Sequence, residues 1–170
     1  MKKQITYSIL FVIVSLIGYM IYSTVSKVKT KKVVEEKLST LQDLPLLNID
    51  GLTFRKGNLK ANTATIILYF NSECKHCQYE AESISQNAAK FEHANLLWVS
   101  YETIPSISQF AKSYNLLNYP NIYFTKIDHE DVYQTFGSVT IPHIFIYDKN
   151  SILVKEYKGE TKMEALLKYL

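Results

Sequence analysis

Cysteine is almost absent from this chain of 170 residues, since its only two cysteines lie in the tetrapeptide Cys74-Lys75-His76-Cys77. So few thiols exclude a fold cross-linked by several disulfides and a zinc site built from cysteines alone. Arginine is scarcer still, because Arg55 is the only one. Nucleic-acid-binding surfaces rely on arginine for bidentate contacts with phosphates and bases, so no nucleic-acid partner is expected.

Acidic residues are absent from residues 1–32, which contain six lysines, so the formal net charge of +3 originates here and the rest of the chain is net acidic. Residues 5–22 carry no charge and are mostly apolar, which meets the lower length limit of a membrane-spanning helix. A cleaved signal peptide has the same basic start and apolar core, but no Ala-x-Ala-like site follows. We therefore predict a basic N-terminus over residues 1–4 and a transmembrane anchor or signal-anchor over residues 5–23.

Residues 24–44 form the segment between this anchor and the rest of the chain. Charged and apolar residues alternate in its second half, and Pro45 ends the pattern, which indicates a short juxtamembrane helix or, in preference, a solvated juxtamembrane linker. The remaining residues, 45–170, are enough for one domain with its own core. Lysines flank the apolar segment on both sides, but long domains translocate largely regardless of charge. We expect a single-pass, membrane-anchored protein whose domain lies on the extracytoplasmic (periplasmic or cell-surface) side.

Hydrophobic periodicity predicts the elements of residues 45–170. Strands are expected at residues 46–49, 52–54, 65–71, 96–100, 121–127, 144–148 and 152–157. Helices are expected from Cys74 to Phe91 with Ser72 as a cap, over residues 106–114, and over residues 161–170 behind a capping box at Thr161 to Glu164. Strands that alternate with helices and end in a hairpin and a helix predict an α/β fold with an open mixed sheet covered on both faces.

The two cysteines follow the apolar run 65–70 and open the first helix of this domain. Unpaired N–H groups and the positive end of the helix dipole favour a thiolate at this place, which indicates a reactive dithiol. Structural zinc is one alternative, although no Cys or His pair supplies the other two ligands, and we expect no metal. A structural disulfide is another, although closing so short a loop constrains the unfolded chain little.

The chain resembles the thioredoxin fold and, more narrowly, the TlpA/ResA-like thiol-disulfide oxidoreductases of the redoxin group. The resemblance covers roughly residues 45–170 and rests on four features: the Pro45…Asp50-Gly51…Phe54 opening, the strand into Asn71-Ser72-Glu73-Cys74-Lys75-His76-Cys77, the run Phe136 to Pro142 before a strand, and Gly159 before the final helix. It departs from thioredoxins at Leu68, where a buried acid is usual, and at Glu73, where a tryptophan is usual.

The resemblance implies a thioredoxin-like fold, a central mixed β-sheet flanked by helices, with an oxidoreductase activity. Cys74 would attack a protein disulfide and Cys77 would resolve the mixed disulfide, with no bound cofactor and with another membrane redox protein as partner. The peptide bond to Pro142 would be cis, and the backbone of Ile141 would bind an extended substrate segment. For Pro142 alone, an ordinary proline at the start of a strand is the alternative.

Lys75 and His76 lie between the cysteines, where positive charge would stabilise the Cys74 thiolate and favour oxidant behaviour. The alternative for both is a solvent-facing side chain without such an effect. His143, directly after Pro142, would line the same groove or lie on the surface of its strand.

Two other functions remain open at this point. A peroxiredoxin-like thiol peroxidase needs a hydroxyl and an arginine beside its thiolate, but Asn71 and Ile67 stand at the relevant positions. A membrane-tethered, non-enzymatic binding module is also possible, because a fold does not fix a function.

Overall fold

The computed structural model describes residues 2–170, together with the side chains of residues 15–26, 28–29 and 32–170. The chain divides into two compact units, Met1–Glu36 and Lys37–Leu170, which we describe separately.

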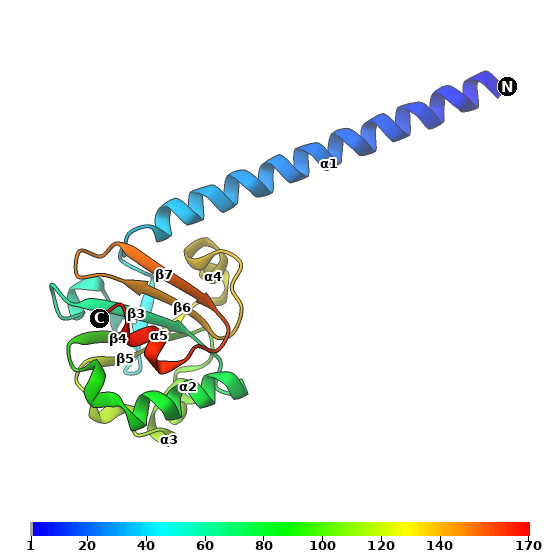
Figure 1. The fold of residues 1–170 in the computed structure, drawn as a ribbon. Coiled ribbons are helices and arrows are strands. Elements are labelled where there is room, and N and C mark those ends of the chain that lie inside the picture. The colour runs from blue at the N-terminus through cyan, green and yellow to red at the C-terminus, as the bar shows by residue number, and fades with distance from the viewer. Residues whose placement is uncertain (1) are drawn as a thin grey trace. The chain divides into compact units, whose positions relative to one another are not determined.

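The second unit is built around a seven-stranded mixed sheet with the order β2-β1-β5-β4-β3-β6-β7 (Figure 1). Its three central strands, β5, β4 and β3, are parallel, and every other pair is antiparallel. The strands are β1 (Leu46–Asn48), β2 (Thr53–Phe54), β3 (Ala64–Tyr69), β4 (Ala94–Ser100), β5 (Ile122–Ile127), β6 (His143–Tyr147) and β7 (Leu153–Lys158). The mixed sheet predicted from the sequence is therefore confirmed.

Helices connect and cover these strands. They are α2 (Lys75–Gln86), α3 (Ile104–Ser113), α4 (His129–Phe136) and α5 (Met163–Leu167), with short 3₁₀ turns at Lys56–Asn58, Ala88–Phe91 and Leu116–Asn118. Helix α1 (Lys2–Leu38) precedes the sheet. The crossovers from β3 to β4 and from β4 to β5 contain α2 and α3, as parallel neighbours require.

Two buried clusters fill the space on either side of the sheet. Side chains of α2, α3 and α5 pack on one face, where Phe70 contacts Trp98 edge to face at 5.3 Å between ring centroids. Side chains of α4 and of the β1–β2 hairpin pack on the other face, where Phe136 stacks on Phe145. The central strand β3 contributes to both clusters, with Ile66 and Ile67 each fully buried. Its continuous apolar sequence follows from this two-sided burial.

Helix α4 was missed by the sequence analysis. Asp128 occupies its N-cap position, Glu130 and Asp131 lie in its first turn, and Gly137 ends it with a φ of 72°. Acidic residues near the first turn and a glycine after the last are ordinary helix signals. Only Val132 and Phe136 are buried in this helix, so its apolar periodicity was too short to detect.

The predicted linker over residues 24–44 is partly built into the sheet. The Leu41 N–H donates to Ser151 O at 2.8 Å, and the Leu153 N–H donates to Ser39 O at 2.9 Å. Leu41 is buried among the apolar side chains of the second cluster. The compact unit therefore begins at Lys37, upstream of the predicted domain start at residue 45.

The transmembrane helix predicted over residues 5–23 is not supported, because no helix within the described residues is long and apolar enough to cross a membrane. In the described part of α1, Ser15, Gly18 and Ser23 interrupt the apolar side chains, and Lys29 and Lys32 follow. Residues 5–14 of the predicted anchor belong to the part of α1 whose side chains lie outside the described ones.

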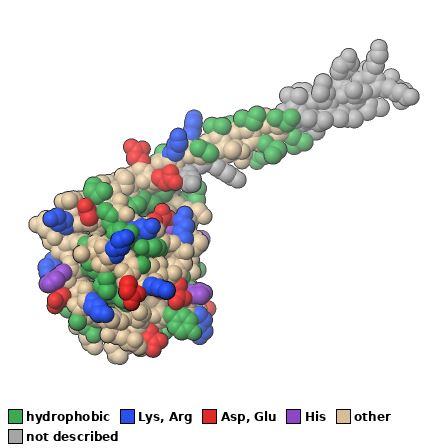
Figure 2. All heavy atoms as spheres, in the orientation of Figure 1, with side chains coloured by type: hydrophobic (Ala, Val, Ile, Leu, Met, Phe, Trp, Pro, Cys, Tyr) green, Lys and Arg blue, Asp and Glu red, His purple; other side chains and the backbone are tan. Residues whose placement is uncertain are grey.

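Lysine and acidic side chains are interspersed on the face of the sheet-containing unit that Figure 2 shows, with small apolar areas between them.

Candidate active site

The dithiol lies where the chain leaves β3 and enters α2. Cys74 is the residue that caps α2 and has extended backbone angles, and Cys77 lies one turn further along the helix. Both are free thiols. Cys74 is half-buried, whereas Cys77 has an exposed fraction of 0%. A substrate disulfide can therefore reach Cys74 but not Cys77.

A carboxylate from another part of the sheet fixes the loop before Cys74. Glu102, just after β4, accepts hydrogen bonds from the Ser72 N–H at 2.7 Å and from the Ser72 hydroxyl at 2.6 Å. The Gln78 side chain donates to Ser72 O at 2.9 Å, and the Cys74 N–H donates to Asn71 O at 3.2 Å. The expectation that Ser72 caps the helix is wrong, because Glu102 engages its hydroxyl.

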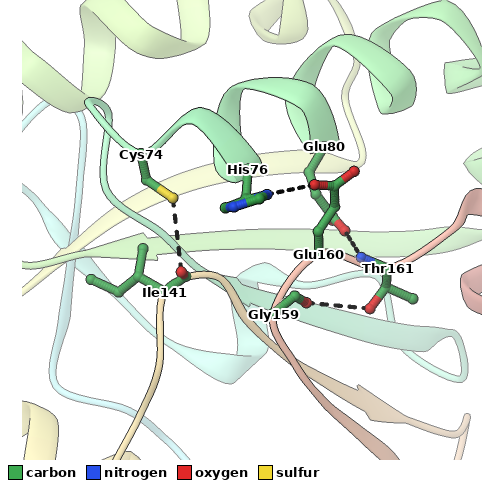
Figure 3. A network of polar contacts seen from close by, with 7 residues as sticks. All are labelled: Cys74, His76, Glu80, Ile141, Gly159, Glu160 and Thr161. Atoms are coloured by element: carbon green, nitrogen blue, oxygen red, sulfur yellow. Dashed lines mark hydrogen bonds and ion pairs between the residues drawn. The ribbon is translucent and has the colours of Figure 1, made fainter.

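The structure brings the backbone of Ile141, which precedes Pro142, to the dithiol. The Cys74 Sγ atom lies 3.8 Å from the carbonyl oxygen of Ile141 (Figure 3), and the Ile141–Pro142 peptide bond is cis. Ile141 contacts both apolar clusters, so its backbone is held between the two faces of the sheet. The peptide groups of this segment therefore border the only accessible sulfur of the pair.

Burial raises the pKa of the Cys77 thiol well above its usual range, and the nearby Cys74 and Glu80 act in the same direction. A backbone hydrogen bond from Asn71 acts against this increase. Cys77 therefore stays protonated at neutral pH, and it needs a proton acceptor before it can attack.

Glu80 is a buried acid on the dithiol helix to which the sequence analysis assigned no role at the site. Its side chain is only 3% exposed, and one oxygen, Oε1, accepts a hydrogen bond from the Thr161 N–H at 2.7 Å (Figure 3). The other oxygen, Oε2, is buried and has no hydrogen-bond partner among the described residues. Burial, reinforced by the charge of Glu160, raises the pKa of Glu80 to about 7, although the hydrogen bond from Thr161 opposes the increase.

The helical period could have revealed Glu80. Cys77, Glu80, Ala81 and Ile84 are the buried positions of α2, so the acid follows Cys77 by three residues on the buried face. The contact with Thr161 also explains why the predicted capping box is wrong. The Thr161 N–H is bonded to Glu80, and α5 begins at Met163 behind Lys162.

Lys75 and His76 lie on the exposed side of α2. The Nδ1 atom of His76 lies 2.6 Å from a carboxylate oxygen of Glu160, in the loop between β7 and α5 (Figure 3). The Lys75 ammonium donates to Gln78 at 3.3 Å. His76 is thus paired with an acid that offsets its charge when it is protonated.

His143 neither lines the groove nor lies on the surface, contrary to both expectations. Its side chain is 1% exposed, and its Nε2 atom lies 2.7 Å from Glu156 on β7. The ring of Phe145 stacks on the His143 ring at 4.5 Å between centroids, and together with Glu156 it encloses the imidazole.

Among the side chains that the structure describes, no group of three or more His, Cys, Asp or Glu residues is placed to hold a metal ion.

Comparison with known proteins gives three findings. The AhpC/TSA family model matches residues 38–156. The thiol-disulfide oxidoreductase ResA of Bacillus thuringiensis subsp. konkukian is 25% identical over 142 residues, which cover 80% of this chain and 79% of ResA. Two Mycobacterium tuberculosis structures have the same fold.

The first of these structures is a secreted disulfide oxidoreductase homologous to E. coli DsbE. It has a TM-score of 0.62 at 16% identity and covers 79% of this chain and 96% of its own. The second is DsbF, with a TM-score of 0.63 at 17% identity, covering 78% of this chain and 94% of its own. These likenesses confirm the thioredoxin-like fold.

Proposed function

Because the chain belongs to the AhpC/TSA family and is a thiol-disulfide oxidoreductase of the ResA-like redoxin group, we propose that Cys74 and Cys77 form its reacting pair and exchange a dithiol for a disulfide with protein substrates. The observation that carries this proposal is the position of the half-buried Cys74 sulfur, 3.8 Å from the Ile141 carbonyl and one helical turn from a fully buried second thiol.

The exchange proceeds in two displacements. The Cys74 thiolate attacks one sulfur of a substrate disulfide, forms a new S–S bond to it, and expels the other sulfur as a thiolate that takes a proton from water. Cys77 then loses its proton and attacks the Cys74 sulfur, which forms the Cys74–Cys77 disulfide and releases the second substrate thiol. Two electrons pass from the protein to the substrate, and the reverse sequence oxidises a substrate dithiol without a bound cofactor.

Ile141 and Pro142 supply the substrate-binding backbone. A substrate segment beside Cys74 has to be extended to present its disulfide to a sulfur at the end of a helix. The carbonyl of Ile141 is the hydrogen-bond acceptor nearest that sulfur among the contacts described. A peptide N–H next to the substrate disulfide would donate to it and align the two sulfurs.

Glu80 takes the proton of Cys77 in this proposal. It is a carboxyl group on the same buried face of α2, its charge acts on Cys77, and its Oε2 atom is free of hydrogen bonds among the described residues. With a pKa of about 7, it is ionised in a substantial fraction of molecules at neutral pH. Thioredoxins usually have a buried acid at the strand position that Leu68 occupies here, and Glu80 takes the role of that acid.

Lys75 and His76 tune the reduction potential. Positive charge at the start of α2 stabilises the reduced, thiolate-containing state and shifts the couple towards oxidation of substrates. Glu160 limits this effect because it lies 2.6 Å from His76. A second redox protein renews the spent form of the dithiol.

The first test asks whether Cys74 and Cys77 are oxidised and reduced reversibly by two electrons. Equilibration of the purified protein in glutathione buffers should interconvert two species that differ in mass by two hydrogen atoms, and the protein should accelerate insulin reduction by dithiothreitol. A potential near −270 mV indicates a reductase, and one near −120 mV an oxidant. Absence of exchange together with rapid consumption of hydrogen peroxide would instead favour a peroxidase.

We further propose that the domain works outside the cytoplasm. Support comes from the basic start and the uncharged run over residues 5–22, and from a structural neighbour that is a secreted protein. In bacteria expressing the full chain, a membrane-impermeant maleimide should label Cys74 in cells whose outer barrier is opened but whose inner membrane is intact. Labelling that appears only after lysis would contradict this location.

A further inference from the structure

His143 connects the substrate-facing segment to the edge strand of the sheet. It is the first residue of β6 and follows Pro142 directly. Its Nδ1 atom accepts a hydrogen bond from the Thr140 N–H at 3.3 Å, and its Nε2 atom lies 2.7 Å from Glu156 Oε1. The ring stacks on Phe145, with 4.5 Å between the centroids. This buried imidazole therefore links Thr140, the residue before Ile141, to Glu156 on β7.

These partners fix the protonation state of His143. A backbone N–H can only donate, so Nδ1 has to present its lone pair to Thr140. The proton of the neutral ring is then on Nε2, which donates it to the Glu156 carboxylate. A second proton on Nδ1 would place two N–H groups opposite each other and remove the bond to Thr140.

We propose that His143 is a positioning residue for thiol-disulfide exchange, whose neutral ring holds the Thr140–Pro142 segment against Cys74 and whose protonation releases it. This inference rests on the proposed function, because it assigns the held segment to substrate binding. The link is short: Thr140 is bonded to His143, Ile141 is the next residue, and its carbonyl faces the Cys74 sulfur.

The charged and titratable groups around His143 come from both neighbouring strands. Glu156 and Lys158 face it from β7, and Tyr69 lies opposite it on β3. Burial lowers the pKa of His143 below its ordinary 6.5, and Lys158 acts in the same direction, whereas Glu156 opposes the decrease. Burial raises the pKa of Glu156, but its contacts with His143 and Lys158 outweigh this effect, so Glu156 is ionised.

The sign of the pH effect follows from these directions. At neutral pH the ring is uncharged and the bond to Thr140 is made. As the pH falls through the lowered pKa of His143, which lies below 6.5, Nδ1 gains a proton and the segment loosens. Substrate exchange therefore declines in mildly acidic solution beyond the decline that the Cys74 thiolate population causes.

Two substitutions separate the two hydrogen bonds of His143. In His143→Asn, the amide oxygen takes the place of Nδ1, accepts from Thr140 and does not titrate. In His143→Gln, the amide nitrogen takes the place of Nε2 and donates to Glu156, but nothing accepts from Thr140. A residue that only stabilised the sheet through Glu156 would tolerate Gln better than Asn.

The activity test divides the rate of insulin reduction by the rate of Cys74 alkylation with iodoacetamide at the same pH, which removes the effect of the thiolate population. At pH 7.5 we expect His143→Gln to lower this ratio by about threefold to tenfold, as the loss of one hydrogen bond implies. His143→Asn should stay near the wild-type ratio and lose the additional decline at acidic pH. Equal ratios for Asn and Gln, or a ratio for Gln above that for Asn, would overturn the proposal.

Nuclear magnetic resonance of the wild-type protein keeps the proposal testable if the variants do not fold or if no exchange activity is found. The neutral ring should carry its proton on Nε2, and hydrogen-exchange protection of the Thr140 amide should decrease together with His143 protonation. A proton on Nδ1 at pH 7.5, or protection that is independent of this titration, would overturn the proposal whatever the outcome of the activity assay.

Discussion

Replacement of Cys74 by serine should reduce protein-disulfide exchange to the uncatalysed background, a decrease on the order of 10³-fold or more, as for enzymes that lose their nucleophile. The physical reason is the accessibility of the two sulfurs. Cys74 is half-buried beside the Ile141 carbonyl, whereas Cys77 is fully buried and its pKa is raised by that burial. A serine hydroxyl is not ionised at neutral pH and cannot replace the thiolate.

Cys77→Ser is the matched variant, and its expected behaviour is different. Cys74 still attacks the substrate, but no thiol can resolve the product, so the mixed disulfide with the substrate accumulates. Mass spectrometry of the variant after incubation with an oxidised peptide should show one peptide per protein, linked at Cys74. Accumulation on Cys77 in Cys74→Ser, with none on Cys74 in Cys77→Ser, would reverse the assigned order of the two thiols.

Replacement of Glu80 by glutamine should remove a large part of the pH dependence of stability. The pKa of Glu80 is about 7 in the folded protein and 4.5 in its ordinary state. Between these values the unfolded chain releases the proton while the folded protein keeps it, so the free energy of unfolding falls as the pH rises from 4.5 to 7. For a side chain that is 3% exposed, this difference amounts to about 3 kcal/mol at pH 8.

Glutamine preserves the acceptor for the Thr161 N–H but cannot ionise, so Glu80→Gln should lose the decline that Glu80 causes and keep only the pH dependence that other groups, such as His143, contribute. Urea unfolding of the reduced proteins at pH 5, 6, 7 and 8 measures the free energy of unfolding at each pH. Glu160→Gln is the matched control: its carboxyl lies in the same region but is half-exposed, and we expect a small change. Parallel profiles for wild type and Glu80→Gln would show that the buried carboxyl does not titrate in this range.

The same variant tests the proton acceptor. If Glu80 takes the proton of Cys77, then Glu80→Gln should slow the resolution of the mixed disulfide while leaving the attack of Cys74 on the substrate unchanged. Rapid-quench measurement with an oxidised peptide separates the two steps. Equal slowing of both would assign Glu80 a structural role only.

Local sequence patterns predicted most of the sheet correctly because each strand carries its own signal. The apolar run at 65–70 predicted β3, and residues 121–127 predicted β5. Both runs are long enough for their residue pattern to indicate a strand. Helix α4 was not predicted because only two of its residues, Val132 and Phe136, are buried. The capping box at Thr161 was wrong because a residue of α2, distant in the sequence, binds the required N–H group.

The sequence by itself determined the strands, the helices other than α4, and the position of both cysteines at the start of a helix. These depend on residues close together in the chain, whose spacing can be read directly. Only the tertiary structure decided that Glu80 is buried beneath Thr161, that Glu102 holds Ser72, and that His143 is enclosed between β3 and β7. Burial and hydrogen-bond partners depend on which distant segments meet, and those contacts set the charge state of a carboxyl or an imidazole.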